Sequence, residues 1–159
     1  MNKYLWFFVV LLGLLKVNAQ RDSILIIAKW DGGKMLNIQQ KIIYHNTKNQ
    51  DLKQIKLLNW SAAYTDKKTP LAKRKLEDER TEMYFANIED LGGISELKIR
   101  DKDTTFYNVN EKNENIYLPI SLEKGAKKEL NLSYQISLPN ALFTGYGKDK
   151  DKILLKYFF

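Results

Sequence analysis

The single histidine of this chain limits the hydrolytic chemistry that its residues can support. A zinc hydrolase typically carries His-Glu-x-x-His on a helix, where two imidazoles bind the metal and the glutamate acts as base. The chain has one histidine, His45, and no cysteine, so neither this ligand set nor a thiolate site can be assembled. His45 lies on the polar side of a strand-like run, and we expect it to be an exposed surface residue. A serine triad would need the same histidine as base, and no serine lies in a Gly-x-Ser-x-Gly sequence.

The carboxylates of the chain also lack a catalytic pattern. They are densest over residues 77–82, where they alternate with basic residues at spacings typical of ion pairs along an exposed helix; these acids are Glu77, Asp78, Glu79 and Glu82. The glycine pairs Gly32-Gly33 and Gly145-Tyr146-Gly147 lack the lysine and serine of a phosphate loop, and we interpret both as turns. The sequence therefore indicates no catalytic, cofactor-binding or metal-binding residue.

Five aromatic residues are the remaining candidates for a binding surface. Aromatic side chains on a sheet can form a platform for a carbohydrate or a peptide, and here they are Trp30, Trp60, Tyr64, Phe106 and Tyr107. Strands are rich in aromatic residues whether or not they bind anything. We therefore favour a role in the core or on the sheet surface, and keep the platform as the alternative.

The first nineteen residues are typical of a secretory signal peptide. Lys3 supplies a positive start, an apolar run follows over Leu5–Leu15, and small residues precede an expected cleavage between Ala19 and Gln20. The alternative, a membrane anchor, needs about 20 apolar residues, and Lys16 ends this run earlier. We expect an exported protein, periplasmic or extracellular or at the cell surface, with no membrane span after cleavage.

The charge of the expected mature chain does not indicate nucleic-acid binding. Loss of Lys3 and Lys16 leaves 24 basic and 19 acidic residues, a formal net charge of +5 in place of +7. The densest basic run, residues 73–75, is followed directly by the acids of residues 77–79, whereas a nucleic-acid surface gathers basic residues on one side.

The rest of the chain predicts a mainly β fold. Residues alternate between apolar and polar in most segments between the turn signals, which is the period of a half-buried strand; the expected strands are Ser23–Trp30, Leu36–His45, Lys53–Trp60, Ile94–Arg100, Thr104–Val109, Ile116–Leu122 and Leu130–Leu138. Gln40 is the one polar residue on the apolar face of its strand. Thr69 and Pro70 are typical of a helix start, and we expect one inserted helix over about residues 70–87. These elements predict an antiparallel β-sandwich in a single domain, residues 20–159.

The last residues form an apolar, strand-like segment, Ile153–Phe159. An exposed apolar edge is a liability that proteins usually avoid. We therefore expect the chain to be the front part of a longer protein, and keep the alternative that this segment pairs within the sheet of a complete one.

Several segments resemble one known family. They are Leu36–Asn46, Leu58–Tyr64 followed by Thr69–Arg74, and Tyr134–Pro139 leading to Phe143–Gly147. Together they resemble the amino-terminal β-domain of membrane-alanyl-aminopeptidase-like (gluzincin) zinc metallopeptidases, in the secreted form of Bacteroidetes-type bacteria. The resemblance covers nearly all of residues 20–159.

The resemblance implies a non-catalytic role for this chain. In that family a thermolysin-like catalytic domain follows the β-domain and holds the zinc, and none of its zinc ligands matches a position here. The resemblance thus implies a domain that supports the substrate cleft of a catalytic domain absent from this chain, with zinc and a peptide substrate belonging to the parent protein. The alternative is a stand-alone periplasmic or cell-surface β-sandwich module that binds a peptide, protein or glycan, and a third is a structural domain of a surface assembly.

Overall fold

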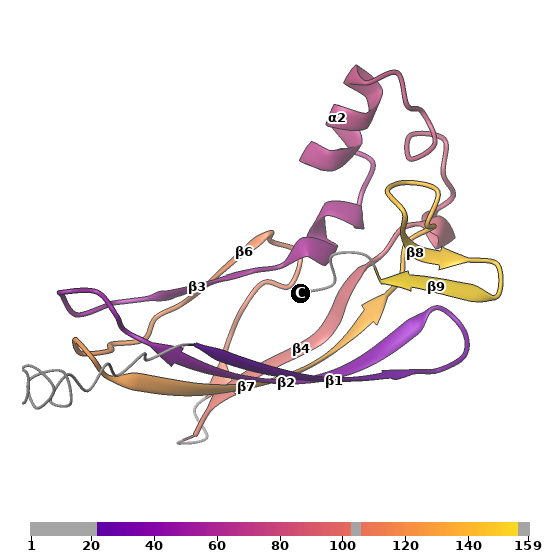
Figure 1. The fold of residues 1–159 in the computed structure, drawn as a ribbon. Coiled ribbons are helices and arrows are strands. Elements are labelled where there is room, and N and C mark those ends of the chain that lie inside the picture. The colour runs from indigo at the N-terminus through magenta and orange to yellow at the C-terminus, as the bar shows by residue number, and fades with distance from the viewer. Residues whose placement is uncertain (1–21, 103–105, 156–159) are drawn as a thin grey trace, which may run out of the picture.

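The fold is built on one five-stranded antiparallel sheet, with strand order β1-β2-β7-β4-β5 (Figure 1). It is seen in a computed structural model, which describes residues 22–102 and 106–155. The strands of this sheet are β1 (Ser23–Trp30), β2 (Met35–His45), β4 (Gly93–Asp101), β5 (Phe106–Tyr107) and β7 (Lys127–Ser137). The expected mainly β fold with antiparallel strands is therefore confirmed.

The central strands of the sheet are β2 and β7. Apolar and polar residues alternate along both, and their pairing sets apolar residues opposite apolar ones. They pair from Met35 opposite Ser137 to His45 opposite Lys127. Directly paired residues share a face of a sheet, so Leu36 meets Ile136 and Ile42 meets Leu130, all four of them buried. Polar residues of both strands point to the opposite face, which we call the outer face.

A tight turn joins β1 to β2, as the sequence predicts at residues 31–33. The Asp31 side chain accepts a hydrogen bond from the Gly33 N–H at 2.7 Å, and Gly32 adopts the left-handed φ of 85° that favours glycine. The turn fixes the register in which Trp30 pairs with Leu36, and β1 becomes the edge strand of the sheet.

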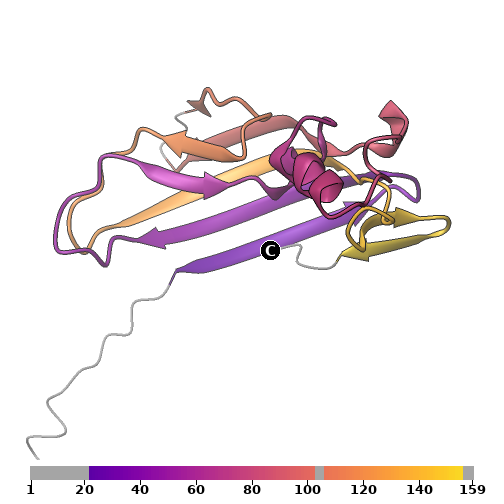
Figure 2. The same ribbon diagram turned by 90° about the horizontal axis from the view of Figure 1, so that it is seen from above.

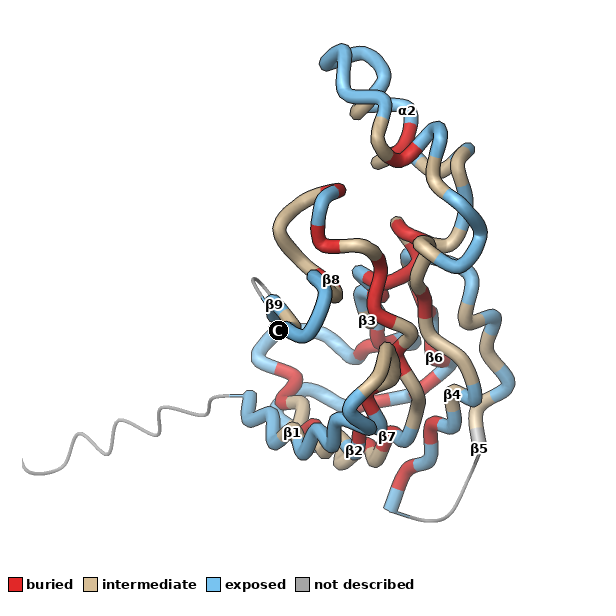
Figure 3. The backbone as a smooth tube through the Cα atoms, turned by 90° about the vertical axis from the view of Figure 1, so that its right-hand side faces the viewer, coloured by how far each residue is buried: buried red, intermediate tan, exposed pale blue. Residues whose placement is uncertain are grey.

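A second, two-stranded sheet covers part of the inner face. It consists of β3 (Ile55–Leu58) and β6 (Asn115–Leu118), and the buried residues of Figure 3 gather between it and the large sheet. Leu118 and Ile99 are fully buried there. Both strands are shorter than expected. Pro119 has no N–H to continue the ladder after Leu118, and Trp60 begins a 3-10 helix, η1 (Trp60–Tyr64), rather than ending a strand.

The expected helix is present but ends earlier than predicted. Helix α2 spans Pro70–Glu77, and the Thr69 hydroxyl caps it by accepting a hydrogen bond from the Ala72 N–H at 3.3 Å. Glu79 adopts a left-handed φ of 59°, which reverses the chain, so the prediction of a helix to residue 87 is wrong. Met83 still packs with Ala72 in one buried cluster, and this explains why the spacing of apolar residues resembled a longer helix.

The remaining elements lie at the end of the inner face that is away from β3 and β6. They are the 3-10 helix η2 (Ile88–Asp90) and the hairpin of β8 (Tyr146–Asp149) and β9 (Lys152–Leu155). Seen from above in Figure 2, this hairpin and α2 lie at one end of the large sheet, with β3 and β6 toward the other. Tyr146 and Gly147 belong to β8 rather than to the turn predicted for residues 145–147, although Gly145 turns with a φ of 80°.

His45 is buried, so the prediction that it is an exposed residue is wrong. Its exposed fraction is 7%, because it ends an inner strand and Asp22 lies against it. Asp22 accepts a hydrogen bond from the His45 backbone N–H at 2.7 Å, and its Oδ1 lies 3.5 Å from the imidazole Nδ1. This contact anchors the start of β1.

Some expectations fall outside the described residues. These are the signal peptide of residues 1–19, the start of the strand expected at Thr104, and residues 156–159 of the expected final strand. The first part of that final strand, residues 153–155, lies in β9 (Lys152–Leu155). Within the described residues, no helix has the length and apolar character needed to span a membrane.

Candidate binding site

A groove of about 570 Å³ lies on the inner face of the large sheet, between β1, η1 and β8. Four aromatic residues line it, namely Trp60, Tyr64, Tyr134 and Tyr146. We call it the aromatic groove. Its size is within the usual range of ligand pockets, which are mostly apolar with a few polar groups.

The floor of the aromatic groove comes from β2 and β7. Gln40 is the polar residue that interrupts the apolar face of β2, and its Oε1 accepts a hydrogen bond from the Tyr134 hydroxyl at 2.9 Å. Burial, with a smaller contribution from the nearby Tyr146, raises the pKa of Tyr134 to about 12. The phenol therefore stays protonated and can keep donating to Gln40 at any ordinary pH.

The wall of the aromatic groove joins η1 to β8. The Tyr64 hydroxyl and the Thr144 hydroxyl are 2.8 Å apart, and the Tyr64 and Tyr146 rings lie 5.5 Å apart at a tilt of 44°. Burial raises the pKa of Tyr146 to about 12; a hydrogen bond with Ser61 opposes this shift, and the nearby Tyr64 adds to it. These contacts fix the positions of Tyr64 and Tyr146 relative to each other.

The mouth of the aromatic groove is apolar and open to solvent. Trp60 is 68% exposed, Leu58 64% and Ile24 61%, and each comes from a different element. Such clustered exposure of large apolar residues is typical of an interaction site. Asn59, also in the lining, is 4% exposed, and no described residue donates a hydrogen bond to its side-chain oxygen.

The structure separates the five aromatic residues of the sequence prediction. Trp60 and Tyr64 line the aromatic groove. Trp30 donates from its indole to the Gly33 carbonyl at 3.1 Å, at the far end of β1, and the Tyr107 hydroxyl donates to Asp101 at 3.1 Å. The side chain of Phe106 lies outside what the structure describes. A single five-residue platform is therefore not formed.

Two of the four acidic residues of the α2 region form ion pairs, and one of these two pairs has the helical spacing that the sequence predicts. Arg74 pairs with Asp78 at 3.2 Å and Arg80 with Glu82 at 3.3 Å. Across residues 22–102 and 106–155, no group of three or more histidine, aspartate or glutamate side chains is arranged to hold a metal ion.

Sequence reasoning missed Gln40, Tyr134 and Tyr146 as site residues. The sequence does contain a signal for Gln40, because this residue breaks an otherwise regular apolar face. Comparisons with protein-family models, with curated proteins and with solved structures found no match for this chain.

Proposed function

We propose that this chain is the non-catalytic β-domain of an exported, aminopeptidase-like zinc metallopeptidase, and that its aromatic groove helps to form the wall of the substrate cleft. The observation that carries the proposal is where the resembling segments lie. Leu36–Asn46 contributes Gln40 of the floor, Leu58–Tyr64 contributes two of the three mouth residues and η1, and Phe143–Gly147 contributes the part of the wall that faces η1. Segments far apart in the sequence thus meet at one groove.

The chemistry of the aromatic groove suits an extended peptide. Its exposed apolar mouth can bury hydrophobic side chains, and the hydroxyl of Tyr146 and the amide of Gln40 can bond to a peptide backbone. In this proposal the β3–β6 pair and the large sheet are the two layers of the expected sandwich, and the signal peptide directs the protein out of the cytoplasm.

The mass of the native exported product tests the link to a catalytic domain. Antibody raised to residues 20–159 would recover the product from its own cells for intact mass spectrometry. We expect a product several-fold heavier than this chain. A product ending at Phe159 would refute the link and favour the alternative, a stand-alone exported module that uses the same groove.

A groove variant tests the role in substrate binding. In the native product, Trp60→Ala should raise KM for peptide substrates severalfold with little change in kcat, because it removes exposed binding surface away from the reacting atoms. Trp30→Ala is the matched control, since Trp30 is also exposed but does not line the groove. Equal kinetics for both variants would show that the aromatic groove does not contact substrate.

A further inference from the structure

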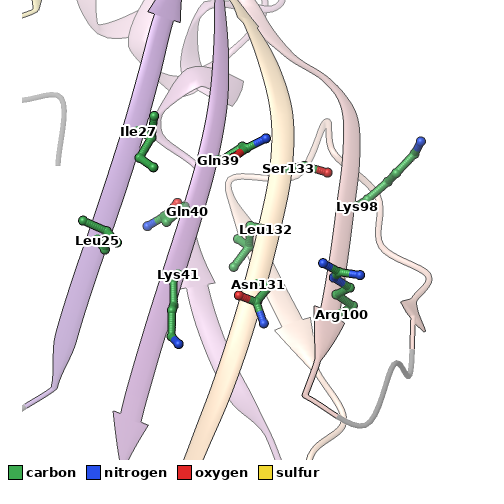
Figure 4. Close-up of a pocket in the computed structure, with 10 residues that line it drawn as sticks. All are labelled: Leu25, Ile27, Gln39, Gln40, Lys41, Lys98, Arg100, Asn131, Leu132 and Ser133. Atoms are coloured by element: carbon green, nitrogen blue, oxygen red, sulfur yellow. The ribbon is translucent and has the colours of Figure 1, made fainter.

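The outer face of the large sheet carries a separate hollow of about 470 Å³ that crosses four strands (Figure 4). In the part of the chain that the structure describes, no helix or strand packs over this face (Figure 1). We call it the outer hollow. One flank is cationic and the other is apolar, and both flanks are exposed.

The cationic flank is on β4. Lys98 and Arg100 are two residues apart on this strand and share the outer face, and neither forms an ion pair with a described residue. Lys41, on the same face, differs because its Nζ lies 2.9 Å from the Glu129 carboxylate. That hydrogen bond lowers the pKa of Glu129. Lys98 and Arg100 thus differ from Lys41 in having no carboxylate of a described residue within ion-pair distance.

A β-bulge sets the direction of these cations. The pairing of β4 with β7 shifts between Ser95 and Lys98, and Glu96 within the bulge has a φ of 54°. If the same residues continued from Ser95 in strict alternation, with no bulge, Leu97 would point to solvent and Lys98 toward the core. The strand thus accepts a left-handed residue and still presents two positive charges on the outer face.

The apolar flank is on β1, at the edge of the sheet. Leu25 is 59% exposed and Ile27 is 49% exposed, and both share the outer face with mostly polar residues of β2 and β7. Gln39, Asn131 and Ser133 lie between the two flanks. Three interstrand steps separate β1 from β4, which is a span of about 14 Å.

The register aligns these side chains in two rows. In the first row, Leu25 of β1 lies opposite Lys41 of β2. Lys41 lies opposite Asn131 of β7, and Asn131 lies opposite Arg100 of β4. The next row has the same order, with an apolar residue on β1 and Lys98 on β4. Each row therefore runs from an apolar end through hydrogen-bonding groups to a cation.

We propose that the outer hollow binds an amphiphilic carboxylate, such as a medium-chain fatty acid, lying across the strands. Its acid group would contact Lys98 and Arg100, whose guanidinium can bind a carboxylate with two hydrogen bonds. Its apolar chain would cover Leu25 and Ile27. Charge complementarity selects the anion, and the exposed apolar flank selects a ligand with an apolar tail. This inference does not depend on the function of the aromatic groove.

The test is a calorimetric titration of the purified full-length protein with decanoate below its micelle concentration. We expect saturable binding that weakens at least tenfold in Lys98→Gln/Arg100→Gln and also in Leu25→Thr/Ile27→Thr. Lys53→Gln, an exposed lysine outside the hollow, should bind like the wild type. Decanol and acetate, each lacking one half of the ligand, should both bind at least tenfold more weakly. Unchanged melting temperatures would show that the variants are folded.

Two results would overturn the proposal. The first is decanoate affinity that is unaffected by loss of the two cations, or matched by decyltrimethylammonium. The second is binding to phosphatidylglycerol vesicles, by co-sedimentation, with no binding of monomeric decanoate, since this would make the outer face a membrane contact instead.

Discussion

Alkaline unfolding should reveal the buried hydroxyl of Tyr134. Its pKa of about 12 in the folded protein lies above the ordinary value of 10, so the phenol ionises first in the unfolded chain. The stability linked to this proton is complete below pH 10 and is lost as the pH rises from 10 to 12. At 1.36 kcal/mol per pKa unit, the loss is about 1.4 kcal/mol at pH 11 and about 2.7 kcal/mol above pH 12.

Tyr134→Phe isolates this effect from the other groups that titrate at high pH. At pH 8 the variant should be less stable by about 1–3 kcal/mol, because the Gln40 side chain loses its hydrogen bond. At pH 11 this deficit should shrink by about 1.4 kcal/mol, since the variant has no phenol to ionise.

Urea unfolding at pH 8, 10 and 11 measures the deficit at each pH. Tyr117→Phe is the control for the loss of a tyrosine hydroxyl at an exposed position, because Tyr117 is 52% exposed. A Tyr134→Phe deficit that is equal at pH 8 and pH 11 would refute the argument, and would mean that water reaches the phenol in the folded protein.

Two further predictions concern the framework. Asn46→Ala should lower the free energy of unfolding by about 2–4 kcal/mol in urea titrations. The reason is that the buried Asn46 amide donates to three backbone carbonyls at 2.9–3.0 Å. A loss under about 0.5 kcal/mol would contradict this role. Gly147→Ala should prevent stable folding, since an added Cβ would lie 2.0 Å from the Pro139 carbonyl oxygen. Gly32 also has a positive φ, 85° against 132° for Gly147, but an added Cβ there has no neighbour within 4 Å, so Gly32→Ala should lower the melting temperature only modestly. Similar melting temperatures for these two variants would contradict the steric argument.

The sequence predicts β1, β2 and β7 of the large sheet well because these strands are long and regular. The alternation in β2 and β7 indicates both their type and the face that each residue occupies. The burial of His45 is not predicted, because alternation indicates which face of the sheet a residue is on but not what covers that residue. Its burial depends on Asp22, which precedes another strand and which local pattern cannot place.

The end of α2 shows a different limit. Apolar residues at helical spacing, such as Ala72 and Met83, predict that they share a core, and they do. The spacing does not tell a continuous helix from a reversal at Glu79. Glutamate rarely adopts a left-handed conformation, so nothing in the residue type marks the turn.

The sequence alone predicts only part of the candidate site. Gln40 breaks a regular pattern and is therefore detectable, whereas Tyr146 is one aromatic residue among many. Its importance comes from Tyr64 and Ser61, which reach it only after the chain has folded. The outer hollow depends likewise on a bulge in β4 that reverses the alternation at a point with no glycine or proline.

The pairing of β2 with β7 has a consequence for the order of events during synthesis. The β1–β2 hairpin leaves the ribosome early. The strand that pairs with the other edge of β2 is β7, which is synthesised much later. Such non-local pairing is slow. Until residues 127–137 arrive, one edge of β2 has no hydrogen-bonding partner in the sheet, and this edge is the segment that a chaperone would have to shield from aggregation.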